Sequence, residues 1–318
     1  MCATATGFAL HLVDRSVALN IGIITPQGWT GEFNGWDPAR AWSRTVDVAR
    51  LAEALGFESV WLYDHLHTVP RPTEEITFES FTSLTAIAAA TDRVRLGHVV
   101  ICTAFRNPAL LAKMISTMDV ISGGRMEVGI GAGWKRDEWL AYGYGFPDTK
   151  ERLATLADHL EVIKRMLAPG RATYAGQHAS VEDAINVPKP LQEHLPIMVG
   201  GNGPKVTWRL AARHADELNV DGMRPDDVGA ALPVIRSRCE EIGRDPDSLA
   251  VSAHVWWEDW AMSSQERVDR LGAYRELGVS RVITMLRETA ESDEALAKFA
   301  DECRAAGATL EASTALGA

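Results

Sequence analysis

The pair Asp64-His65 is the part of the sequence best suited to acid–base chemistry, because it directly follows a short apolar run at 58–63. An imidazole beside a carboxylate can donate or accept a proton near neutral pH. The same two side chains can equally be hydrogen-bonded structural groups, so the pair alone leaves both roles open. His67 follows two residues later, but no third ligand accompanies the two histidines, so we expect no metal ion.

Two glycine-rich segments would let the backbone approach a ligand closely. Residues 200–203 (GGNG) lie between an apolar run and a helical pattern, where N–H groups can meet a phosphate at a helix start. Residues 129–133 (GIGAG) follow another apolar run but lack the G-x-G-x-x-G spacing of a dinucleotide fold. An ordinary tight turn in the first segment and close packing at a rim in the second remain open as alternatives.

Tryptophans gather near the same positions, and this much indole on one face suits a planar aromatic ligand, although some of these side chains must be core. No G-x-S-x-G motif is present, so serine hydrolase chemistry is not indicated. The tryptophans concerned are Trp29, Trp36, Trp61, Trp134, Trp139, Trp256, Trp257 and Trp260.

The elements that must position these residues alternate between short apolar runs and longer helical patterns. Eight such units predict a closed (β/α)8 TIM barrel, whereas an open doubly wound sheet would have fewer units. The expected strands are 19–25, 58–63, 94–101, 126–131, 196–200, 217–220, 249–255 and 281–286. The expected helices are 38–55, 76–91, 108–122, 148–168, 203–214, 225–243, 263–277 and 291–307.

Active sites of such barrels form where the strands end, so Asp64, Cys102, Gly131 and Gly200 are expected at one end of the barrel. Two long loops, 132–147 and 169–195, predict an insertion between the fourth and fifth strands. We expect residues 1–18 to be an N-terminal extension and residues 19–318 to form a single barrel domain.

The composition excludes several classes of partner. With 43 acidic and 32 basic residues the net charge is −11, which argues against nucleic acid and anionic membranes. No apolar run is long enough to span a membrane, residues 1–18 do not resemble a signal peptide, and the four cysteines are widely spaced. We therefore expect a soluble, cytoplasmic protein that acts on a small molecule.

With these residues assembled, the chain resembles the luciferase-like monooxygenase superfamily and, within it, the F420-dependent oxidoreductases. The resemblance extends from about residue 19 to about residue 260 and weakens after that. The Asp64-His65 pair resembles the deazaflavin branch. The segments that carry the resemblance are IGIITPQG (21–28), GFESVWLYDHLHTVPRP (56–72), RVRLGHVVICTAFRNPALLAKMISTMDVISGGRMEVGIGAGW (93–134), YGYGFPDTKERL (142–153) and PIMVGGNGPKVTWRLAARHAD (196–216).

The resemblance implies a homodimer whose barrel mouth holds an isoalloxazine-like ring. It implies catalytic roles for His65 and Asp64 beside the ring, and a non-proline cis peptide between Val99 and Val100 that backs it. The implied cofactor-binding residues are Asp64, Val99, Val100, Cys102, Gly131, Ala132, Gly133 and Trp134 for the ring and side chain, and Gly200, Gly201, Asn202 and Gly203 for the phosphate.

The sequence also departs from one group of relatives. The sugar-phosphate dehydrogenases of this branch have Glu where Trp134 stands and Trp where Val69 stands. These differences argue for a more apolar substrate. Three functions remain open: hydride transfer between coenzyme F420 and a small apolar molecule with an activated double bond, an FMN-dependent two-component monooxygenase, and a cofactor-binding barrel without turnover. We expect the first, with tighter binding of F420 than of FMN.

Overall fold

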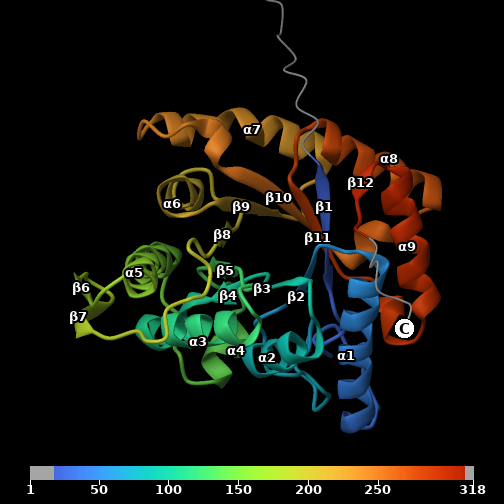
Figure 1. Cartoon of the computed structure of the whole chain (residues 1–318), viewed down its shortest axis with the longest axis horizontal. Coiled ribbons are helices and arrows are strands. Elements are labelled where there is room, and N and C mark those ends of the chain that lie inside the picture. The colour runs from blue at the N-terminus through green and yellow to red at the C-terminus, as the bar shows by residue number, and fades with distance from the viewer. Residues whose placement is uncertain (1–17, 312–318) are drawn as a thin grey trace, which may run out of the picture.

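The computed structural model describes residues 18–311, in which a parallel barrel is surrounded by helices (Figure 1). The barrel strands are β1 (Leu19–Ile24), β2 (Ser59–Leu62), β3 (Arg95–His98), β4 (Ile101–Cys102), β5 (Val128–Gly131), β8 (Ile197–Gly200), β9 (Glu217–Asp221), β10 (Ala250–Val255) and β11 (Arg281–Thr284). The helices are α1 (Pro38–Leu55), α2 (Ser80–Ala90), α3 (Pro108–Ile121), α4 (Arg136–Ala141), α5 (Thr149–Leu167), α6 (Thr207–His214), α7 (Pro225–Glu240), α8 (Ser264–Glu276) and α9 (Asp293–Ala305).

The third barrel strand is interrupted, and β3 and β4 are its two halves. The hydrogen-bonding order is β3-β2-β1-β11-β10-β9-β8-β5-β4, so the order begins and ends on this one strand. Leu96 of β3 also exchanges backbone hydrogen bonds with Arg125 and Glu127, just before β5. These contacts close the sheet. The peptide between Val99 and Val100 is cis, which confirms the prediction for that bond.

The barrel helices begin and end where local chemistry favours a boundary. Asp37 accepts a hydrogen bond from the N–H of Arg40, and Pro38 occupies the first turn of α1, where no N–H partner is needed. Gly56 ends this helix with a φ of 93°, a left-handed conformation that glycine adopts without steric cost. Asn107 caps the N-terminus of α3, where its side chain accepts hydrogen bonds from the N–H groups of Ala109 and Leu110. These short-range signals explain why the sequence predicted the helix positions so closely.

Trp61 of β2 fills the middle of the barrel. Its side chain is fully buried, and its Nε1 donates to Ser59 Oγ at 2.7 Å. Glycines on the two neighbouring strands leave space for the indole, because a Cβ on Gly97 would lie 2.2 Å from Trp61 and one on Gly22 would lie 2.4 Å from it. Close packing of this kind fills the interior of the barrel and supports the loops at the carboxyl ends of the strands.

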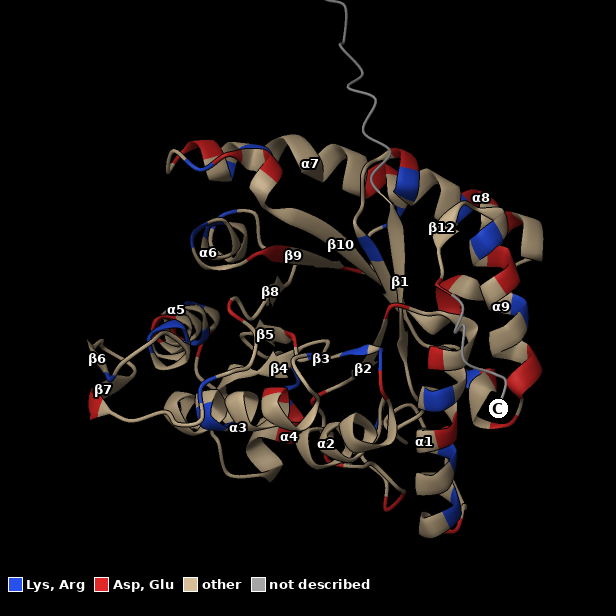
Figure 2. Ribbon diagram, viewed as in Figure 1, with Lys and Arg blue, Asp and Glu red and all other residues tan. Residues whose placement is uncertain are grey.

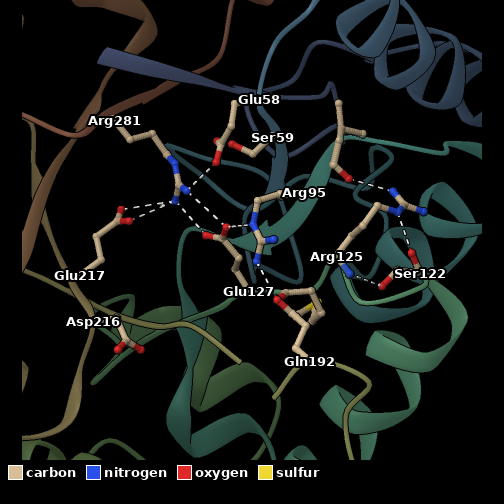
Figure 3. Close-up of polar contacts among 12 residues, drawn as sticks. Glu58, Ser59, Arg95, Ser122, Arg125, Glu127, Gln192, Asp216, Glu217 and Arg281 are labelled. Atoms are coloured by element: carbon tan, nitrogen blue, oxygen red, sulfur yellow. Dashed lines mark hydrogen bonds and ion pairs between the residues drawn. The ribbon is translucent and has the colours of Figure 1, made fainter. Parts of the chain in front are cut away.

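A buried charge cluster closes the opposite end of the barrel from the predicted site (Figure 3). Arg281, at the start of β11, donates to Glu58 and Glu127 at 2.8 Å each and to Glu217 at 3.2 Å. Arg95 also pairs with Glu127. Burial raises the pKa of Glu217, whereas the adjacent arginines outweigh the effect of burial on Glu127 and lower its pKa. The cluster joins the starts of several strands.

The region between β5 and β8 contains more regular structure than we predicted. Residues 132–147 and 169–195 were expected to be loops, but they include α4 and a hairpin of β6 (Ala172–Ala175) and β7 (Ser180–Ala184). The hairpin lies outside the ring of helices (Figure 1). Asp158 of α5 accepts hydrogen bonds from the hydroxyl of Tyr174 at 2.7 Å and the backbone of His178 at 2.6 Å, which explains how the hairpin is held.

Charged residues of both signs lie on the outer helices α7, α8 and α9 (Figure 2). None of the helices in residues 18–311 is long and apolar enough to cross a membrane. A short strand, β12 (Ala308–Thr309), adds to β1 outside the barrel order. The N-terminal extension predicted for residues 1–18 lies almost entirely outside the described residues.

Candidate active site

The carboxyl ends of the barrel strands surround a cavity of about 290 Å³. Because all barrel strands are parallel, residues that follow different strands meet at this one mouth, as predicted. All the predicted site residues line the cavity except Asn202 and Gly203. Those in the lining are Asp64, His65, Val99, Val100, Cys102, Gly131, Ala132, Gly133, Trp134, Gly200 and Gly201.

Asp64 is a buried carboxylate whose hydrogen-bonding capacity is filled. Arg106 donates to both its oxygens, at 2.7 and 3.0 Å. Ser80 Oγ donates to Oδ1 at 2.8 Å, and the backbone N–H of Cys102 donates to Oδ2 at 2.9 Å. Four donors match the four lone-pair positions of a carboxylate. Burial raises the pKa of Asp64, but the charge and hydrogen bonds of Arg106 outweigh burial and lower it.

The proton-transfer role expected for Asp64 therefore does not fit its surroundings. Its lone pairs are all engaged, and its lowered pKa opposes the uptake of a proton near neutral pH. The carboxylate instead ties the end of β2 to the end of the interrupted third strand, because Cys102 is the last residue of β4 and Arg106 follows the turn after it.

His65 pairs with Glu138 rather than with its sequence neighbour. His65 Nδ1 lies 2.8 Å from Glu138 Oε2, and the side chains are 12% and 1% exposed. The other oxygen of Glu138 accepts the backbone N–H of Leu66 at 2.5 Å. The imidazole stacks on Trp29, with ring centroids 4.2 Å apart and planes within 5°. Carboxylate and indole together fix the ring orientation, so that Nδ1 faces Glu138 and Nε2 is left for other contacts.

The floor of the cavity is the interrupted third strand. Val100 fits against glycines on two other strands, since a Cβ on Gly131 or on Gly200 would lie 2.8 Å from its methyl groups. Gly133 has a φ of 76° and approaches Cys102, whose thiol pKa is raised by burial. A thiol with a raised pKa is a poor nucleophile, so Cys102 contributes an apolar surface.

A second polar chain lies on another wall of the cavity. Tyr63 Oη is 2.9 Å from His254 Nε2, and His254 Nδ1 is 2.8 Å from Asp221 Oδ1. Burial, followed by the charges of nearby carboxylates, raises the pKa of Tyr63 well above its usual value. Trp256 contacts both rings, at a centroid distance of 6.2 Å from Tyr63 and 4.5 Å from His254.

The predicted phosphate segment is only partly available to a ligand. The N–H of Gly201 donates to Asn219 O at 2.9 Å, within the barrel ladder. The side-chain amide of Asn202 exchanges two hydrogen bonds with the backbone of Asp221, at 2.7 and 2.9 Å. The start of α6 is more open, because Val206 caps it without a side-chain hydrogen bond and Thr207 lines the cavity. Uncapped N–H groups at a helix start favour an anion.

Sequence reasoning missed the partners that orient these groups. Glu138 lies in the segment that we predicted to be a loop. The structure places it on the short helix α4, which the sequence analysis did not predict. Tyr63 and Arg106 lie near the ends of predicted strands, but neither belongs to a sequence motif that would have identified it as a functional residue. Among the described residues, no cluster of His, Cys, Asp and Glu could hold a metal ion. Lys135 lines the cavity and pairs with Asp137 at 2.8 Å.

The fold and the mouth define a TIM-barrel protein with a built ligand site at the ends of its strands. The family model "Luciferase-like monooxygenase" matches residues 23–314. This chain belongs to the luciferase-like monooxygenase family.

Individual relatives agree with this assignment. An F420-dependent glucose-6-phosphate dehydrogenase of Microbacterium testaceum is 30% identical over 80% of this chain and 82% of its own length. An uncharacterized protein of Mycobacterium tuberculosis is 29% identical over 78% of this chain and 89% of its own. An F420-dependent secondary alcohol dehydrogenase, solved with an F420–acetone adduct, has the same fold, with a TM-score of 0.76, 19% identity, and coverage of 91% and 99%.

Proposed function

We propose that this protein is an F420-dependent oxidoreductase that reduces an activated double bond in a small, apolar substrate. The observation that carries the proposal is the orientation of His65, held between buried Glu138 and the plane of Trp29 at the mouth of the cavity. Similarity to F420-dependent glucose-6-phosphate dehydrogenases supports the choice of cofactor.

The cavity fits the chemistry of a deazaflavin. Its floor of Val99 and Val100 is apolar, which suits an aromatic ring, and glycines at the rim leave the backbone uncovered. The start of α6, without a side-chain cap, lies where a phosphate would be stabilised. When bound, the cofactor supplies a hydride, and the protein supplies orientation and proton management.

The residues of the chain then divide these tasks. His65 is the group that exchanges a proton at the reactive edge, through the ring nitrogen that does not face Glu138. Glu138 and Trp29 position the imidazole. We assign Asp64 a positioning role, because it fixes the turn that carries Arg106 and the floor strand. The aromatic walls exclude water from the reacting atoms.

The lining favours a neutral, apolar substrate. Aromatic side chains form much of the cavity wall beside the floor, including Trp29, Tyr63 and Trp256. Lys135 lines the cavity, but its ammonium group is bound by Asp137. A phosphorylated sugar would therefore find little free positive charge there. Trp134 and Val69, which replace the Glu and Trp of the sugar-phosphate dehydrogenases, also favour an apolar substrate over a phosphorylated sugar.

Cofactor titration tests the proposal directly. We expect purified protein to bind F420 more tightly than FMN, measured by fluorescence in parallel titrations. Reduced F420 should then be oxidised in the presence of a conjugated enone such as 4-phenyl-3-buten-2-one, and glucose 6-phosphate should not reduce oxidised F420. Micromolar FMN binding without F420 binding would instead favour the two-component monooxygenase.

The homodimer, the single-domain organisation and the cytoplasmic location remain predictions from the sequence. The family resemblance supports the dimer, and the composition supports the location. Light scattering after size-exclusion chromatography would measure the mass against 34.7 kDa for one chain.

A further inference from the structure

The hydrogen-bonded series Tyr63–His254–Asp221 runs along one wall of the cavity, and the roles proposed for His65 and Glu138 do not involve it. All three residues line the cavity. Tyr63 and His254 are each 3% exposed, whereas the Asp221 side chain is 48% exposed and so meets solvent. The three residues come from the end of β2, from β10 and from the end of β9. Only the closed barrel brings them together.

This series is held rigidly along its length. The side chain of Gln27 accepts the N–H of Tyr63 at 3.1 Å and donates to its carbonyl at 2.9 Å. Asn202 clamps the backbone of Asp221 through two hydrogen bonds. The ring of Trp256 packs against that of His254 with an angle of 75° between their planes. Such preorganisation preserves two consecutive hydrogen bonds in the geometry that proton transfer requires.

We propose that Tyr63 is the acid that protonates the substrate, and that His254 and Asp221 relay protons to it from solvent. This inference rests on the proposed reductase function and extends it, because addition of a hydride to a double bond must be completed by a proton. His65 serves the cofactor edge, and the Tyr63 hydroxyl serves the substrate side of the same cavity.

Reduction of the double bond requires one hydride and one proton. One substrate atom takes the hydride, which the reduced cofactor supplies, and the π electrons of the broken bond move to the other atom. That atom takes the hydroxyl proton of Tyr63. The proton on Nε2 of cationic His254 moves to the Tyr63 oxygen and restores the phenol. Solvent then returns a proton to His254, and the carboxylate of Asp221 stabilises the imidazolium.

The observed hydrogen bonds permit both states of this relay. Ionised Asp221 can only accept, so Nδ1 of His254 carries a proton. In neutral His254 the Nε2 atom then accepts from the Tyr63 hydroxyl. In the imidazolium both nitrogens donate, which frees the hydroxyl of Tyr63 to donate into the cavity. Burial raises the pKa of Tyr63 well above its usual value, so the hydroxyl gives up its proton only as cationic His254 donates one to the same oxygen.

Tyr63→Phe tests the inference, with Tyr174→Phe as the matched control. Tyr174 also loses one hydroxyl hydrogen bond to another side chain, but it lies on the hairpin outside the barrel. The probes are 2-cyclohexen-1-one, 4-phenyl-3-buten-2-one and benzaldehyde, each with reduced F420. We expect Tyr63→Phe to lower kcat about 10²-fold or more, with KM and the Kd for F420 changed less than about twofold. The control should retain wild-type values.

Asp221→Asn provides a second measurement, because this half-exposed side chain can be changed without threatening the fold. We expect kcat to fall about tenfold, since the amide no longer stabilises the imidazolium. If Tyr63→Phe fails to fold or to bind F420, the kcat of Asp221→Asn decides, and an unchanged value overturns the relay.

Wild-type kcat in Tyr63→Phe overturns the relay alone and leaves the proposed function intact. A wild-type protein that binds no F420, or that reduces none of the three probes, overturns the proposed function and the relay with it.

Discussion

Replacement of His65 by Ala and by Asn separates proton transfer from structural pairing. In His65→Ala, Glu138 Oε2 loses the imidazole, whereas Oε1 keeps the N–H of Leu66. A carboxylate that is 1% exposed then lacks one partner, which should lower the free energy of unfolding by about 1–3 kcal/mol. Loss of the acid–base group should also lower kcat about 10²–10⁴-fold, equivalent to about 3–5 kcal/mol of transition-state stabilisation.

His65→Asn should show only the second effect. The amide can still donate toward Glu138, so we expect unfolding within about 1 kcal/mol of the wild type, but it cannot exchange a proton. His194→Ala is the control for loss of an imidazole–carboxylate pair, because His194 contacts Asp216 at 2.7 Å with 73% of its side chain exposed. Its unfolding free energy should change by about 0–1 kcal/mol, and its turnover should not change.

The assays are urea unfolding, fluorescence titration with F420, and single-turnover oxidation of reduced F420 by an enone. Wild-type turnover in His65→Ala would show that the residue is structural. Equal losses of stability in the Ala and Asn variants would contradict the part of the reasoning that concerns Glu138.

Three further predictions concern the scaffold. Asp64→Asn should lower the free energy of unfolding by about 1–3 kcal/mol at pH 7 because the buried guanidinium of Arg106 loses one of its two carboxylate partners and keeps only Glu79, as urea titration can measure. Because the folded-state pKa of Asp64 is lowered, the wild type should hold this contribution above the unfolded pKa of about 3.9 and lose it as pH falls through the folded value. Arg281→Met should destabilise the fold by about 3–5 kcal/mol at pH 7 and by less at pH 5, where the buried carboxyls it leaves unpaired can take up protons; an equal loss at both pH values would contradict this. Gly97→Ala should cost about 1–3 kcal/mol or more because its Cβ meets Trp61 at 2.2 Å, whereas Gly272→Ala on α8, with open space around it, should be neutral or stabilising by up to about 1 kcal/mol, as thermal unfolding of the pair can measure.

The sequence determined most of the fold because its signals are local. Apolar runs, caps such as Asp37 and stop residues such as Gly56 act within a few residues, and they placed every barrel strand within three residues at each end. The strand after Arg93 was predicted as continuous, but the structure divides it at Val99 and Val100. The end of the barrel that holds the site followed from the parallel order alone.

The tertiary structure alone decided which groups act on one another. His65 and Glu138 are 73 positions apart, and Tyr63 and His254 are 191 apart. Side chains so distant in sequence meet only when the barrel closes, and no local pattern encodes that distance. For the same reason the sequence paired His65 with its neighbour Asp64, whereas the fold gave that carboxylate to Arg106 and brought Glu138 to the imidazole.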